Sequence, residues 1–125
     1  MLTNNIRLAF AVTSLAFTSA ACVHGKEVGP DLGSDKTNQV IIGKSTEADL
    51  ITLFGNPDGK RLEKLSEESL ASDHSLGACG AAGDFVTWLT YASATAYISG
   101  ASSSVWDFGL NRDGVVCAKV NHTGG

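Results

Sequence analysis

Residues 43–57 read Gly-Lys-Ser-Thr-Glu-Ala-Asp-Leu-Ile-Thr-Leu-Phe-Gly-Asn-Pro and carry the clearest secondary-structure signals of the chain. Thr46 can accept a hydrogen bond from the Asp49 amide while the Asp49 carboxylate reaches back, which makes a capping box at a helix start. Gly55 can adopt a left-handed conformation and Pro57 cannot continue a helix, so both residues favour a stop. The stretch therefore predicts one short helix with both ends marked.

The predicted helix spans residues 47–54 and is apolar along one broad face. The apolar side chains are Ala48, Leu50, Ile51, Leu53 and Phe54. Helices shorter than about 12 residues are marginal in isolation. We therefore expect this helix to pack on a surface that the rest of the chain supplies.

The same stretch resembles the helix signature of the small outer-membrane lipoproteins called SmpA/OmlA, or BamE-like. The matching residues are Gly43 and Thr46 at the start, Leu50 in the middle, and Phe54-Gly55-Asn56-Pro57 at the end. The resemblance implies a fold of two helices and three strands. It also implies a role beside the machinery that inserts β-barrel proteins into the outer membrane, or in envelope integrity.

The N-terminal residues 1–21 have the features of a secretion signal of the lipoprotein type. Arg7 is followed by a mostly apolar run and then by small residues that end at Ala20-Ala21, directly before Cys22. The run is shorter than the about 20 residues of a membrane span. We expect Cys22 to carry the lipid. Ser19 departs from the usual Leu, Val or Ile of a lipobox, so cleavage without lipidation stays an alternative.

The remaining chain is long enough for one domain. Residues 22–39 are rich in polar residues and glycine and predict a flexible tether, and residues 40–125 predict a single α+β domain. The net charge is −4 at pH 7, which argues against a nucleic-acid partner. The predicted location is the periplasmic side of the outer membrane, reached by export and held by the lipid.

Two cysteines remain if Cys22 is acylated. An even pair in an oxidising compartment indicates a disulfide between Cys79 and Cys117. Such a bond would contribute about 3–4 kcal/mol if unstrained. The alternative is two separate buried thiols.

Residues 84–120 predict a three-stranded antiparallel meander. Apolar residues alternate from Phe85 to Tyr91, and a hairpin loop is expected at Asn111-Arg112-Asp113-Gly114. The loose helical spacing of leucines after residue 58 predicts a second helix beside the first. Trp88 and Trp106 are expected to cover the helix, although a ligand-stacking pair is an alternative.

No residue pattern in the sequence indicates catalysis, a metal site or a cofactor. There is no Cys-x-x-Cys motif, and Asn38 stands where a phosphate-binding loop ending at Gly43 needs a glycine. We therefore expect a non-enzymatic, lipid-anchored scaffold with protein partners and no small-molecule substrate. Two alternatives remain: a secreted inhibitor or binding module without a lipid, and a small periplasmic enzyme.

Overall fold

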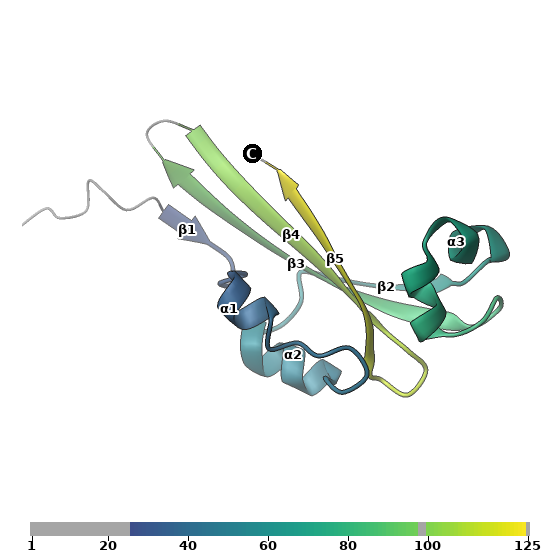
Figure 1. Cartoon of the computed structure of the whole chain (residues 1–125). Helices are drawn as coiled ribbons and strands as arrows, with labels where there is room; N and C mark the ends of the chain where they lie inside the picture. Colours follow the sequence, from purple (N-terminus) through teal and green to yellow (C-terminus); the bar gives the residue numbers. More distant parts are fainter. Residues whose placement is uncertain (1–25, 98–99, 125) are drawn as a thin grey trace, which may run out of the picture.

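The computed structural model describes residues 26–97 and 100–124, which form an α+β arrangement as expected (Figure 1). In chain order its elements are β1 (Lys26–Val28), α1 (Ser34–Thr37), α2 (Glu47–Phe54), β2 (Gly59–Lys64), α3 (Glu67–Ser72), the 3-10 helix η2 (His74–Cys79), β3 (Phe85–Tyr97), β4 (Gly100–Leu110) and β5 (Val116–Gly124).

The strands form one antiparallel sheet in the order β1-β3-β4-β5, and β2 also pairs with β3. The strands β1 and β2 share the same edge of the long β3, with Val28 opposite Ala94 and Lys64 opposite Phe85. The expected meander is present as β3, β4 and β5. The prediction of only three strands is wrong, because β1 and β2 extend the sheet beyond β3.

The strand β2 occupies a segment that we expected to be helical. Leu62 and Leu65 have helical spacing, but Leu62 is 67% exposed whereas Leu65 is 3% exposed. Gly59–Lys64 instead completes a ladder with the edge of β3. The helix of this region, α3, begins only at Glu67. Tertiary pairing therefore overrides the local spacing of leucines here.

The prediction of a flexible tether over residues 22–39 is also corrected from Lys26 onward. Strand β1 and helix α1 lie within it, and Leu32 and Thr37 are buried. Lys119 donates from Nζ to the carbonyl oxygen of Thr37 at 3.2 Å. The folded part thus begins before residue 40. The predicted signal peptide and Cys22 lie outside the described residues.

The helices α1 and α2 lie against one face of the sheet, which we call the helix face (Figure 1). Leu50 and Phe54 of α2 belong to a buried cluster with Leu89, Tyr91 and Phe108. The ring of Phe54 lies 5.3 Å from Tyr91 and 5.6 Å from Phe108, measured between centroids. The predicted apolar face of the helix is therefore buried against the strands.

A second buried cluster lies on the opposite side, which we call the disulfide face. It contains Leu65, Leu76, Cys79, Val86, Trp88, Cys117 and Ala118. A Cβ on Gly109 would lie 3.2 Å from Cζ3 of Trp88 and 3.3 Å from Cβ of Ala118. The absence of a side chain at Gly109 thus lets the indole pack close to the sheet.

The alternation along β3 explains the two clusters. Leu89 and Tyr91 lie in the first cluster, and Val86 and Trp88 lie in the second. Trp106 packs against the first cluster and stacks on Phe108 at 5.8 Å. The expectation that both tryptophans cover the helix is therefore wrong for Trp88, and the two do not form a stacking pair.

Candidate functional site

The residues of the helix motif fix α2 in place. Thr46 accepts a hydrogen bond from the Asp49 amide, and the Thr46 amide donates to the Asp49 carboxylate at 2.9 Å, so the capping box is formed. Gly55 has a φ of 82° and ends the helix. Leu50 and Phe54 are buried, and Pro57 follows in the turn to β2. Each of these residues has a structural task.

The start of the motif also holds strand β5. The Gly43 amide donates to the Val116 carbonyl at 2.8 Å, and the Val116 amide donates to the Ser45 carbonyl at 2.7 Å. Gly43 has a φ of 84°, which a side chain would strain. Thr46 forms an isolated bridge with Val115. The motif therefore joins the helix to the last strand.

Tyr91 closes the other end of the helix. Its hydroxyl donates to the Gly55 carbonyl oxygen at 2.9 Å, and its side chain is fully buried. Burial, together with the nearby carboxylates of Glu47 and Asp58, raises the pKa of Tyr91 from 10.0 to about 12. The phenol therefore stays protonated and keeps donating to the helix end at neutral and mildly alkaline pH.

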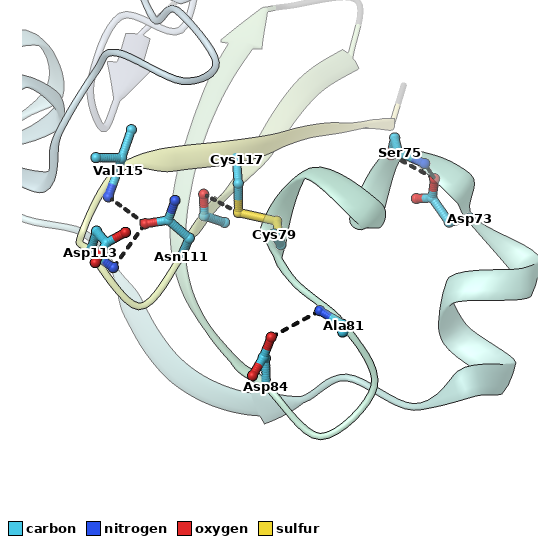
Figure 2. Close-up of a disulfide and its surroundings, with 10 residues drawn as sticks. Asp73, Ser75, Cys79, Ala81, Asp84, Asn111, Asp113, Val115 and Cys117 are labelled. Atoms are coloured by element: carbon cyan, nitrogen blue, oxygen red, sulfur yellow. Dashed lines mark hydrogen bonds between the residues drawn. A yellow bond between two sulfur atoms is a disulfide. The ribbon is translucent and has the colours of Figure 1, made fainter.

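Cys79 and Cys117 are joined in a disulfide with an S–S distance of 2.02 Å (Figure 2). Their Cα atoms are 5.0 Å apart, within the ordinary range for such a bond. Cys117 lies where the register between β4 and β5 shifts, since Gly109 pairs with Ala118 and Leu110 pairs with Val116. The bond thus ties η2 to a bulged strand.

Side chains order the loops around the disulfide (Figure 2). Asp84 accepts a hydrogen bond from the Ala81 amide at 2.9 Å, and Asn111 accepts from the amides of Asp113 and Val115 at 3.0 and 3.1 Å. The predicted hairpin loop is therefore present and is held by Asn111. In the η2 region, Asp73 accepts from the Ser75 hydroxyl and amide, which lowers the pKa of Asp73.

A polar cluster on the disulfide face was not predicted from the sequence. Asp107 is buried, and its carboxylate accepts a hydrogen bond from the Thr90 hydroxyl. His122 Nε2 lies 3.4 Å and Arg61 Nη1 lies 3.8 Å from Asp107 Oδ2. These residues come from four different strands, so no spacing in the sequence could bring them together. Strand pairing does so: Thr90 lies opposite Asp107, whereas Arg61 lies opposite Trp88 and His122 lies opposite Val105, each two residues from that pair.

The same cluster extends to Trp88. The guanidinium carbon of Arg61 lies 5.5 Å from the centroid of the Trp88 ring, a cation–π distance. The indole N–H of Trp88 is buried without a hydrogen-bond partner among the described residues. Arg61 therefore covers the indole on the disulfide face while leaning toward Asp107.

The cluster does not have the arrangement of an activated nucleophile. The hydroxyl of Thr90 donates to Asp107, so it is not paired with the imidazole of His122 as a general base would require. Within residues 26–97 and 100–124, no three His, Cys, Asp or Glu side chains are grouped closely enough to hold a metal ion. The Asp107 carboxylate therefore links side chains of β2, β3 and β5 at the surface of β4.

Apolar side chains are exposed on the helix face beyond α2. Leu62 of β2 is 67% exposed and Phe85 of β3 is 50% exposed. Both line a cleft of about 270 Å³ that also contacts Thr87 and Arg112. Single exposed apolar residues are ordinary, but two that line one cleft are a feature of interaction surfaces.

No family model, curated protein or solved structure matches the chain. Among the described helices, none has the length and apolar character needed to cross a membrane. The functional interpretation therefore rests on the residues and their arrangement.

Proposed function

We propose that the protein is a lipid-anchored interaction module of the bacterial envelope, with Cys22 as the acylated N-terminus on the periplasmic side of the outer membrane. One observation carries the proposal: Cys22 directly follows an apolar leader that ends in Ala20-Ala21. This is where a lipoprotein signal places the modified cysteine.

The folded part begins close to the proposed anchor. Three residues separate Cys22 from the first residue of β1, Lys26. An extended chain spans at most about 3.3–3.6 Å per residue, so this link reaches on the order of 10 Å. The domain would therefore lie near the bilayer surface instead of ranging freely on a long tether.

The disulfide supports export. Cys79 and Cys117 are bonded in a buried position at the base of η2. Such bonds persist in oxidising compartments and are rare in the bacterial cytosol. A disulfide is compatible with both the anchored and the secreted form of the protein.

The proposed role is binding, without catalysis. The cleft with the exposed side chains of Leu62 and Phe85 supports a protein partner. The resemblance of the helix motif favours a partner in the assembly of β-barrel proteins at the outer membrane. Folds of this kind carry several functions, so the partner needs direct identification.

The test is the intact mass of the protein, measured without reduction after extraction from the membrane fraction. The expected mass is that of residues 22–125 with an S-linked diacylglyceryl group, one N-linked acyl chain and two fewer hydrogens for the disulfide. A Cys22→Ala variant should lose the acyl chains and leave the membrane fraction. A Cys79→Ala variant is the matched control, because it should keep the lipid.

The second candidate is a secreted binding module without a lipid. Ser19 favours it, since lipobox cysteines usually follow a branched apolar residue at that place. An unmodified, soluble chain would refute the anchored proposal. A tight soluble complex with one protein would then identify the secreted binder.

A further inference from the structure

The strand β2 lies at an edge of the sheet. It pairs with β3 on one side and, within residues 26–97 and 100–124, with no other strand. The Leu65 amide donates a hydrogen bond to the Asp84 carbonyl oxygen of the facing segment at 2.8 Å. Hydrogen-bonding groups alternate along an antiparallel ladder, so the backbone groups of Lys60, Leu62 and Lys64 point away from β3. Those groups have no hydrogen-bond partner among the described residues.

The same three residues present their side chains on the helix face. Lys60 lies opposite Leu89 and Leu62 lies opposite Thr87 in the register. Lys60 forms an ion pair with Glu47 of α2 at 3.0 Å, which occupies its charge. Lys64 is exposed and has no ion-pair partner in the described part of the chain. The side chains of this edge that remain available to a partner are therefore the apolar Leu62 and the cationic Lys64, which lie two residues apart.

We propose that this edge binds an extended segment of a partner protein as an added strand. The segment would carry an apolar side chain against Leu62 and Phe85, and a carboxylate two residues away that faces Lys64. An added strand gains main-chain hydrogen bonds, and its alternate side chains give specificity. The proposal deepens the interaction role proposed above and rests on it.

Charge complementarity selects this occupant. Lys60 already pairs with Glu47, and Arg61 lies near Glu63 and Asp107. Lys64 is therefore the cation of β2 without an ion-pair partner among the described residues. Lysines on edge strands usually prevent pairing with apolar strands. They do not oppose an acidic strand, because its carboxylates satisfy the same charges. The edge therefore excludes a second copy of β2 and admits an acidic segment.

The cleft beside β2 fits the apolar side chain of the segment. It has a volume of about 270 Å³, and its lining includes Leu62, Phe85, Thr87 and Arg112. Asp84 also lines it, and the carboxylate of Asp84 accepts a hydrogen bond from the Ala81 amide. Arg112 adds a second exposed cation to its border. An aromatic side chain would cover Leu62 and Phe85 while its neighbouring carboxylate meets Lys64.

The test uses a threonine-rich peptide with a phenylalanine two positions from a glutamate. The control peptide has the same sequence with lysine in place of glutamate. Amide hydrogen exchange of the purified protein is measured by NMR with each peptide. The glutamate peptide should slow exchange of the Leu62 and Lys64 amides by at least about tenfold, since those amides become hydrogen-bonded. The amides of Arg61 and Glu63, which already pair with β3, should change little.

A charge-reversal variant supplies the second readout. Lys64→Glu should weaken binding of the glutamate peptide by about tenfold and improve binding of the lysine peptide. Lys44→Glu makes the same change of net charge at an exposed site before α2 and should leave both affinities unchanged.

Three results would overturn the proposal: equal binding of both peptides, no binding up to millimolar concentration, or protection that does not alternate along β2. The intact mass separately tests the anchor. If the protein is lipidated but binds neither peptide, only the proposal of a docking edge is refuted. If it is not lipidated but binds the glutamate peptide, only the proposal of a lipid anchor is refuted.

Discussion

The two faces of the sheet are stabilised by different means. On the helix face, α2 buries Leu50 and Phe54 against rings from the strands, and its ends are fixed by the capping box and by Tyr91. On the disulfide face, η2 contributes Leu76 and Cys79, and a covalent bond joins it to β5. The first face depends on packing and the second on a cross-link.

The difference follows from the composition of the two covering segments. The α2 stretch offers five apolar side chains within eight residues. The segment from Gly77 to Gly83 holds only small residues, so it can bury little apolar surface. A disulfide lowers the entropy of the unfolded chain and so compensates for a small core.

The largest expected effect tests the packed face. Phe54→Ala removes a ring that lies 5.3 Å from Tyr91 and 5.6 Å from Phe108, and should lower the free energy of unfolding by about 3–5 kcal/mol. Ile51→Ala is the control on the same helix. Ile51 is 39% exposed, so Ile51→Ala should lower the free energy of unfolding by well under half as much as Phe54→Ala. Urea denaturation measures both, and similar losses would show that α2 does not pack as described.

The next effect tests the cross-linked face. Replacing both Cys79 and Cys117 by alanine should lower the free energy of unfolding by about 2–4 kcal/mol, because the bond closes a sequence separation of 38 residues. Hydrogen exchange should accelerate in η2 more than in α2. Equal acceleration of exchange in both elements would mean that the two faces unfold as one unit, and would contradict the claim that the disulfide mainly stabilises the disulfide face.

The helix α2 and its packing on the helix face could be predicted, because sequence signals within a few residues define the helix. Thr46, Asp49, Gly55 and Pro57 mark the helix ends by side-chain chemistry that acts within a few residues. The alternation from Phe85 to Tyr91 predicted the strand, although the expectation that Trp88 covers the helix overlooked that Trp88 and Leu89 point to opposite faces. The loop at Asn111 also had its own turn signal.

The edges of the sheet were not predictable, because long-range pairing decides them. Gly59–Lys64 has no period-two apolar pattern, and it is a strand only because β3 is long enough to offer a partner. The same holds for β1. The contacts of Asp107 with Thr90 and His122 depend on register, which the sequence does not reveal before the strands are aligned.

The helices α2 and α3 begin with similar capping boxes but bury different amounts of apolar surface. Thr46 caps α2, which buries Leu50 and Phe54, and Ser66 caps α3, which buries no residue. Thr46→Ala should cost about 1 kcal/mol of unfolding free energy, because the helix must be formed for its face to pack. Ser66→Ala should cost less than about 0.5 kcal/mol, since α3 contributes only the partly buried Leu70 to a core. Equal losses in thermal or urea unfolding would contradict the assignment of α2 as the stabilising helix.

An effect of similar size to the loss of the Thr46 cap concerns the bond between Tyr91 and the end of α2. Tyr91→Phe keeps the ring but leaves the Gly55 carbonyl without this donor, so we expect a loss of about 0.5–1.5 kcal/mol at neutral pH. The pKa of Tyr91 rises from 10.0 to about 12 on folding. Between those values the unfolded chain ionises before the folded one, so unfolding releases a proton and stability falls as pH rises. Below pH 10 both states hold the proton, and above about 12 neither does. The variant should therefore show a shallower alkaline decline in urea unfolding than the wild type. An unchanged slope would mean that Tyr91 ionises as readily in the folded protein as in the unfolded chain.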